Sequence, residues 1–427
     1  MTAGAAPPDP AAPTRGRIAD EAERILRAHV LEKWFPAAID PAGGFHQNFA
    51  PDWRRLEGGP RSVVFQARMT WTAAAANSEY PGETLFAEAN RHGLAFLAAR
   101  FWDERRGGFF FAAGPDGPGA DGAKHAYGQA FAIFAASASP GAGALDLARD
   151  AFAWLDHHGR DPRHGGYFEQ FSREGEPILR RRGRDEIGEA YGGKSLNAHL
   201  HLLEAFSALH RRWPDPRLRA RLAELLALLR AAAASGGLAT SFRRNFRPRR
   251  RPLRALARSL ARREAPSLRA GQSYGHNLEA ACLMDEAAQA LGEDAGADGT
   301  ARALVDRALE EGWDEANGGF RHLGPPGADA RKLWWVQVEA LNALLLMHAR
   351  HGEETSRHRD AFRRAWDFLL VRQLDARHGG LHPVLAPDGR PLDAPKGDGW
   401  TDPYHQTRAL LNVMRTLRKA DAQRPLP

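Results

Sequence analysis

The chain of 427 residues has very little cysteine and no long apolar run. Its one cysteine, Cys282, cannot form a disulfide within the chain,. Such usage fits a reducing compartment, and we expect a cytoplasmic protein. The most apolar segments, such as ALNALLLMHA, are far shorter than the roughly 20 residues that span a membrane,. We therefore expect no membrane partner.

A net positive charge is also lacking outside one segment. The net charge is +7, but eleven arginines and a single glutamate fall between positions 241 and 270. Most of the charge therefore lies in an Arg-rich insertion at about 243–269, and the rest of the chain is slightly acidic. The insertion has few aromatics for stacking on bases beyond Phe242 and Phe246,. A polyanion-binding protein is thus a minor alternative, and we expect no nucleic-acid partner.

The N-terminal segment lacks the apolar stretch of a signal peptide. Residues 1–16 are rich in alanine and proline, which predicts a disordered tail,. We expect residues 17–427 to form a single domain. A chain of this length exceeds most single domains, but closed barrels of repeated units reach it.

A short motif recurs along the chain. DPRHGGYFE, starting at Asp161, combines an aspartate, a polar gap, two glycines and an aromatic. Similar motifs start at Asp40, Asp103, Asp314 and Asp375, and a weaker one at Ser235. The glycines allow positive φ in a tight turn, and the aspartate can accept hydrogen bonds from its backbone. We expect the aromatic that follows to line the mouth of the fold.

Helical periodicity appears in pairs of segments around these turns. The odd segments are 17–38, 83–100, 144–158, 215–233, 300–312 and 354–374; the even ones are 61–77, 124–138, 194–212, 274–291, 332–351 and 402–419. Twelve helices in six similar units predict an all-α (α/α)6 barrel, with six inner helices, six outer helices and short β hairpin segments at the loop face. An open helical solenoid is the alternative.

The even segments carry polar residues within apolar runs, whereas the odd segments are ordinary amphipathic helices. We therefore expect the even helices to face a central cavity. The candidates on them are Arg68, Tyr127, Gln129, Asn197, His201, His276, Glu279, Trp335, Glu339, His405 and Arg408. Trp335 and Trp400 are candidates for stacking on a ligand ring.

The residue types on these helices favour proton transfer. There is no HExxH motif and no cysteine pair, so we expect no metal and no cofactor,. Glycoside hydrolysis needs two carboxylates across a sugar, and we expect the cavity to be rich in histidine and poor in acids. Imidazole suits proton transfer at a carbon next to a carbonyl, because its pKa lies near the working pH. Arg68 is then the fixed cation for an enediolate.

Six ordered motifs resemble a known family. QARMTW, YGQAF, NAHLHLLEA, YGHNLEA, WWVQVEA and PYHQTRALL are similar to motifs of the N-acylglucosamine 2-epimerase superfamily. That group includes cellobiose and mannose 2-epimerases and aldose–ketose isomerases acting on mannose. The resemblance runs from about Trp34 to Met414. It implies an (α/α)6 barrel that acts on unmodified sugars without metal or redox cofactor. We expect a small-molecule sugar substrate and a monomer or homodimer.

The resemblance also implies roles for individual residues. Arg68 matches the arginine that holds the sugar oxygens, and His201, four residues after Asn197, matches the histidine of ring opening and sugar binding. His276 and His405 match the two acid/base histidines. The remaining matches are Glu279, the carboxylate paired with His276, and Trp335 and Trp400, which stack on the sugar.

The chain departs from the family pattern in two places. Asn277 stands where many members have aspartate, and the Arg-rich segment replaces a short link into the helix at 274–291. The Arg-rich segment can reshape the rim of the cavity, so these departures leave the size of the substrate open. The resulting hypothesis is a sugar 2-epimerase that interconverts an aldose and its C2 epimer through a cis-enediolate. The aldose is either mannose/glucose or a glucose-ended disaccharide. The alternatives are an aldose–ketose isomerase and, more remotely, an (α/α)6 glycoside hydrolase.

Overall fold

The computed structural model describes residues 15–114, 117–118, 122–180, 182–234, 237–249, 272–294, 299–324, 329–352 and 354–422. Residues 1–14 of the expected tail and residues 250–269 of the Arg-rich insertion lie outside the described residues. The first helix begins at Arg15, two residues before the expected boundary.

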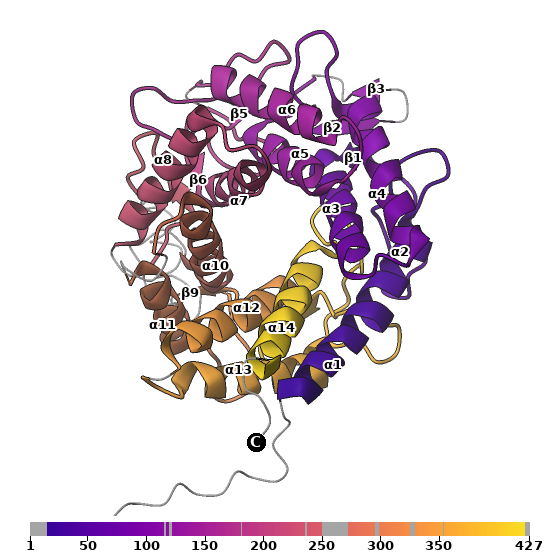
Figure 1. The fold of residues 1–427 in the computed structure, drawn as a ribbon, viewed down its shortest axis with the longest axis vertical. Helices are drawn as coiled ribbons and strands as arrows, with labels where there is room; N and C mark the ends of the chain where they lie inside the picture. The colour runs from indigo at the N-terminus through magenta and orange to yellow at the C-terminus, as the bar shows by residue number, and fades with distance from the viewer. Residues whose placement is uncertain are drawn as a thin grey trace, which may run out of the picture.

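Six helices form a closed inner ring. They are α3 (Val63–Glu79), α5 (Ala126–Ala138), α7 (Leu196–Arg212), α10 (Tyr274–Leu291), α12 (Trp334–His351) and α14 (Tyr404–Ala422). Each packs against the next, and α14 packs against α3, which closes the ring (Figure 1). The closure excludes the open solenoid. All six coincide with the even segments of the sequence to within three residues at each end.

The outer helices surround this ring (Figure 1). They are α1 (Arg15–Ile25), which continues through the π-helical η1 (Leu26–Leu31) into α2 (Glu32–Ala38); α4 (Thr84–Phe96) with η2 (Leu97–Phe101); α6 (Ala144–His158); α8 (Pro216–Ala233); α11 (Thr300–Gly312); and α13 (Arg357–Phe368) with η3 (Leu369–Gln373). They correspond to the odd segments. The described structure is therefore the predicted (α/α)6 barrel.

Short antiparallel strand pairs link neighbouring units. The pairs are β1 (Arg61–Ser62) with β2 (Ala112–Gly114), β4 (Lys124–His125) with β5 (Gln170–Phe171), β6 (Lys194–Ser195) with β7 (Ser241–Phe242), β8 (Gln272–Ser273) with β9 (Leu323–Gly324), and β10 (Lys332–Leu333) with β11 (Val384–Leu385). β2 also pairs with β3 (Gly117–Pro118). A bridge between Phe49 and Gly397 joins the last unit to the first.

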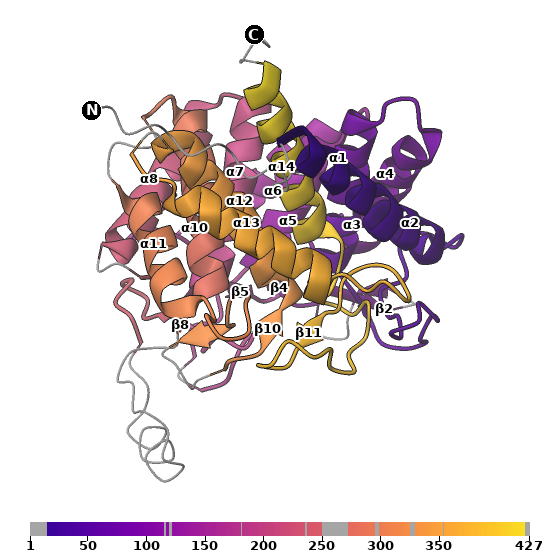
Figure 2. The ribbon, with the colours of Figure 1, turned by 90° about the horizontal axis from the view of Figure 1, so that it is seen from below.

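These strands gather at one end of the barrel, opposite the end at which α14 finishes (Figure 2). We call it the strand-bearing end. In five units a strand leads directly into the inner helix, so the N-termini of the inner helices lie there. Serine caps three of them: Ser62, Ser195 and Ser273 accept hydrogen bonds from backbone N–H groups of the first turn,.

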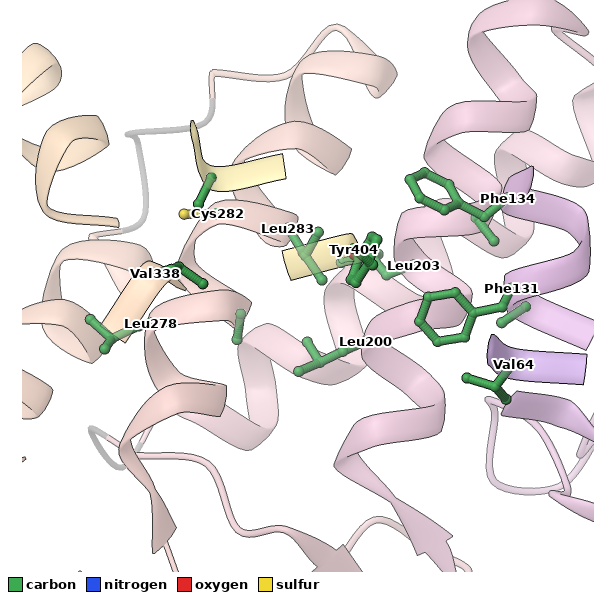
Figure 3. Packing of buried hydrophobic residues seen from close by; sticks show 14 of the residues in the cluster. Val64, Phe131, Phe134, Leu200, Leu203, Leu278, Cys282, Leu283, Val338 and Tyr404 are labelled. Carbon is green, nitrogen blue, oxygen red and sulfur yellow. The ribbon is translucent and has the colours of Figure 1, made fainter. Parts of the chain in front are cut away.

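Inner and outer helices differ in composition because they differ in burial. In α5, the described side chains from Ala126 to Ser137 are all buried. In α13, by contrast, buried Phe362 and Trp366 alternate with arginines on the exposed face,. Apolar side chains such as Val64, Leu200 and Val338 fill the contacts between inner helices (Figure 3).

The Gly-Gly turns take the predicted conformation. In the motif from Asp161, Gly165 and Gly166 have φ of 72° and 64°. Oδ1 of Asp161 accepts hydrogen bonds from the N–H groups of Arg163 and His164. Both glycines also have positive φ in the turns that follow Asp40, Asp103, Asp314 and Asp375.

Each of these aspartates also binds a cation near the start of the inner helix. Lys124, Lys194 and Lys332 lie 3.1 Å from Asp103, Asp161 and Asp314, and all three lysines are fully buried. Arg61 binds Asp40, and Lys396 lies 2.7 Å from Asp375. The fourth unit has no aspartate ahead of its glycines, and Gln272 takes the position of the lysine. Both charges of the pair are therefore absent there.

We expect Lys332→Met to lower the free energy of unfolding by about 3 kcal/mol, because it leaves Asp314 buried without its lysine,. The double variant Asp314→Ser with Lys332→Gln removes both charges together and should lose clearly less. The midpoint of thermal unfolding, followed by circular dichroism, compares the two. Equal losses in both variants would contradict the ion-pair account.

The aromatic after each Gly-Gly pair is buried and does not line the mouth, contrary to expectation. Phe45, Phe109, Tyr167 and Phe320 are at most 1% exposed. A side chain of the inner helix holds the backbone of each. The side-chain amides of Gln66, Gln129 and Gln337 bind the backbones of Phe45, Phe109 and Phe320, respectively. Each amide accepts from the N–H and donates to the C=O of its partner, at 2.6–2.8 Å. His199 accepts from Tyr167 N–H, and Asn277 from Leu238 N–H. We call these five the clamp residues.

No helix in the described ranges is both long enough and apolar enough to cross a membrane.

Candidate active site

The clamp residues set the register of the site. A clamp side chain points away from the barrel axis, towards its turn. Residues two before and two after it lie roughly 160–200° around the helix, so they face the axis. The residues two after the clamps are Arg68, Phe131, His201, Glu279 and Glu339; Arg408, two after Gln406, takes the same place on α14. These six form a layer inside the barrel.

Glu339 joins a histidine and an arginine at the centre of this layer. Its Oε1 lies 2.8 Å from Nδ1 of His405, and its Oε2 accepts a 2.7 Å hydrogen bond from Nη2 of Arg408. All three side chains are at least nine-tenths buried. Burial alone would raise the pKa of Glu339, but Arg408 and His405 hold it below its ordinary value. Glu339 is therefore a carboxylate that fixes the His405 ring and favours its protonated form.

His201 lies on the opposite side of the same layer. Its Nδ1 is 2.9 Å from Oε2 of Glu204, whose other oxygen accepts from the Tyr404 hydroxyl. Oε1 of Glu279 lies 3.7 Å from Nε2 of His201 and 3.8 Å from Nδ1 of His405. Burial and the neighbouring Glu339 raise the pKa of Glu279 well above its ordinary value. Glu279 is thus a carboxyl between two histidines whose surroundings favour its protonated form.

Arg68 sits in an aromatic cage. Its Nη1 donates to Asp402 and its Nη2 to the Tyr127 hydroxyl, both at 2.9 Å. The guanidinium carbon lies 4.3 Å from the centre of the Phe131 ring and 5.0 Å from that of Tyr404. Asn197 lies near enough to the Tyr127 hydroxyl to oppose the rise in its pKa that burial causes. Arg68 is thereby held rigidly, with its charge directed into the barrel interior.

Two histidines contact the same indole from different helices. The Trp335 ring centre lies 4.9 Å from that of His276 and 5.6 Å from that of His405. His276 and Trp335 are half-buried, so this part of the site is open to solvent. Trp400, 48% exposed, lies with its ring centre 6.0 Å from that of Tyr127. Flat faces of Trp335 and Trp400 therefore border the open side of the site.

The two histidines differ in their electrostatic surroundings. Burial, together with His201, His322 and His405, lowers the pKa of His276 to about 3. Its Nδ1 has no hydrogen-bond partner among the described residues. Burial also lowers the pKa of His405, but the hydrogen bond that its Nδ1 donates to Glu339 opposes this. His276 is therefore the neutral base of the pair, and His405 the better proton carrier.

The geometry differs from three expectations about the site, and the roles assigned to these residues stay predictions. Gln129 was expected to bind substrate, but both ends of its amide bind the Phe109 backbone and the side chain is fully buried. Glu279 was expected to pair with His276, but it lies between His201 and His405. The interior was expected to be poor in acids, yet Glu204, Glu279, Glu339 and Asp402 all contribute to it.

The other expected residues fall into two groups that Glu279 joins through His201 and His405. Arg68, His201 and Trp400 contact Tyr127, and Asn197 lies beside it. His276 and His405 contact Trp335, and Glu339 links His405 to Arg408. Sequence reasoning missed Glu204, Asp402 and Tyr404. Tyr404 lies two residues before Gln406, which takes the clamp position on α14. The two-residue spacing from that position would have identified it. Asp402 precedes the helix, so helical periodicity carries no signal for it.

Among the residues that the structure describes, two groups have metal-ligand atoms within 4.8 Å of one another: Glu279 with Glu339 and His405, and His125 with Glu169 and Asp185. Their hydrogen bonds argue against a metal at either place. Glu339 already uses both oxygens on His405 and Arg408. Nδ1 of His125 accepts from Tyr127 N–H, so its Nε2 carries the proton and faces Asp185 at 3.2 Å,.

Known proteins are similar to this chain in sequence and in fold. The sequence profile of the N-acylglucosamine 2-epimerase (GlcNAc 2-epimerase) family matches residues 43–409. A cellobiose 2-epimerase of Eubacterium cellulosolvens is 27% identical, over 92% of this chain and 96% of its own. A D-mannose isomerase of Marinomonas mediterranea is 25% identical, over 93% and 98%. The solved structure of cellobiose 2-epimerase from Spirochaeta thermophila superposes with a TM-score of 0.83 at 29% identity, covering 97% of this chain and all of that one.

Proposed function

The chain belongs to the N-acylglucosamine 2-epimerase family, and we propose that it is a sugar 2-epimerase acting on an aldose such as mannose or glucose, or on a glucose-ended disaccharide. Relatives named as cellobiose 2-epimerases and D-mannose isomerases support a carbohydrate isomerase. The observation that carries the proposal is the pair His276 and His405, both in contact with Trp335. Two histidines beside one flat face suit proton removal and return at one carbon.

The reaction begins with opening of the sugar ring, which exposes a C1 aldehyde; we assign sugar binding at this stage to His201 and Asn197. Neutral His276 then takes the C2 proton, and the electron pair of the broken C–H bond moves into a cis-enediolate. The negative charge on oxygen faces Arg68, whose position is fixed before reaction by Asp402 and Tyr127,.

Return of a proton completes the epimerisation. The imidazolium of His405, supported by Glu339, gives its proton to the opposite face of C2,. His405 ends neutral and His276 ends protonated, so the two histidines exchange roles in the reverse direction. Delivery of the proton to C1 instead would yield a ketose, which is the aldose–ketose isomerase alternative.

The acids of the interior do not favour glycoside hydrolysis, although they are more numerous than expected. Hydrolysis needs a free carboxylate and a protonated carboxyl across the sugar. Asp402 is bound to Arg68, and both oxygens of Glu339 are taken. Among these four acids, Glu279 is the one with an oxygen that lacks a hydrogen-bond partner within the described residues.

Incubation with mannose, glucose and cellobiose in deuterium oxide, with a chelator present, tests the proposal by NMR. We expect deuterium at C2 together with the epimeric aldose, because the C2 proton exchanges with solvent on the histidines. A ketose product would support the isomerase alternative instead. Absence of exchange with every sugar, or release of monosaccharide from cellobiose without its epimer, would refute the epimerase.

A further inference from the structure

In five of the six units, the third residue after the Gly-Gly pair belongs to a ring at the strand-bearing end. Its carbonyl accepts a hydrogen bond from the first N–H of the preceding inner helix. The accepting residues are Phe111, Glu169, Thr240, His322 and Pro383, at 2.8–3.4 Å from helices α3, α5, α7, α10 and α12. Each member therefore stands over the N-terminus of an inner helix, at the entrance to the barrel interior.

His322 is the member of this ring beside the two histidines of the site. Its backbone caps α10, which carries His276 three residues from its start. Its ring centre lies 6.4 Å from that of Trp335 at 81°. It is half-buried and lies close enough to His276 to lower the pKa of that residue. His322 was not among the residues expected from the sequence.

Hydrogen bonding fixes which nitrogen of His322 carries the proton. Nδ1 lies 3.2 Å from Oδ2 of Asp329. Arg331 binds both oxygens of Asp329, at 2.9 and 2.7 Å, and keeps it ionised. A carboxylate accepts only, so Nδ1 of His322 donates the proton and Nε2 presents a lone pair. Nε2 has no hydrogen-bond partner in the described part of the chain.

We propose that Nε2 of His322 accepts a hydrogen bond from a hydroxyl at the non-reacting end of the sugar, which makes His322 a specificity-determining residue. The inference rests on the proposed epimerase function. With C1 and C2 held between His276, His405 and Arg68, the rest of the sugar extends along Trp335 towards the strand-bearing end. A sugar hydroxyl is a donor, and a neutral imidazole with a fixed tautomer is a matching acceptor.

Steady-state kinetics of His322→Ala and His322→Gln test this role, using whichever sugar the wild-type enzyme turns over. We expect the alanine variant to raise KM about tenfold with kcat within about twofold, because one hydrogen bond to bound substrate is lost. The glutamine variant places an amide oxygen near the position of Nε2 and should bring KM back to within about threefold of wild type.

Thr240→Ala is the matched control, since Thr240 holds the same ring position on another unit. It should leave KM unchanged, and all three variants should unfold at the wild-type temperature. An unchanged KM in His322→Ala, a glutamine variant as weak as the alanine one, or a loss confined to kcat would overturn the role. An inactive wild-type enzyme would refute the proposed function instead, so the two failures are distinguishable.

Discussion

Replacing either His276 or His405 by asparagine should lower the rate of epimerisation by about 10³-fold, with the fold retained. General acid–base catalysis by a positioned side chain typically supplies 10²–10⁴-fold. Asparagine keeps polarity at each position but cannot take up or release a proton near neutral pH. Nδ1 of His276 makes no hydrogen bond to the described residues, so its loss should cost little stability. The measurement is the initial rate of epimer formation by NMR.

The two variants should differ in what they still do. With two bases on opposite faces of C2, each histidine serves one epimer as base. The His405→Asn enzyme retains His276, so it should still exchange the C2 proton of one epimer with deuterium oxide without forming the other. The His276→Asn enzyme should show the reverse preference. Loss of exchange for both epimers in both variants would contradict the two-base assignment.

His210→Gln provides the matched control for these substitutions. His210 is also a buried histidine on an inner helix, α7, but it lies near the C-terminal end of that helix, away from the two-residue register of the site. We expect its replacement to leave the rate of epimerisation within about twofold of wild type. A comparable loss in His210→Gln would show that the rate responds to packing and not to proton transfer.

Much of the fold was predictable from the sequence because its signals are local. Helix periodicity and the Gly-Gly turns depend on neighbouring residues, and α6, α10 and α11 match the predicted segments residue for residue. The π-helical ends, such as η3, were predicted simply as helix. Their i to i+5 bonding leaves no distinct pattern of apolar residues.

The site was predictable only in part, since periodicity alone does not say which polar residue of an inner helix faces the axis. Gln129 and Tyr127 are two residues apart, yet one holds a turn and the other binds Arg68. Glu279 lies between His201 and His405 because α7 and α14 flank it in the tertiary structure, and the local sequence does not encode that arrangement. Burial beside Glu339 raises the pKa of Glu279, whereas Arg408 and His405 lower that of Glu339, and these surroundings too are tertiary.

Arg68→Met should lower kcat about 10³-fold, because the enediolate then lacks its fixed cation. Loss of one preorganised donor to a developing oxyanion typically costs 10²–10³-fold, and Arg68 contributes a full charge as well. Arg68→Lys keeps the charge but not the planar geometry that meets Asp402 and Tyr127 together, so an intermediate loss is expected,. The measurement is kcat with the sugar that wild type epimerises.

Stability has to be separated from catalysis in this experiment, because Arg68 is also the partner of a buried charge. Asp402 is fully buried, so Arg68→Met should lower the free energy of unfolding by about 3–5 kcal/mol,. Asp402→Asn in the same chain removes the uncompensated charge and still accepts from Tyr404 N–H. The double variant should therefore regain stability while kcat remains about 10³-fold low. Recovery of both together would mean that Arg68 acts on the fold and not on the enediolate.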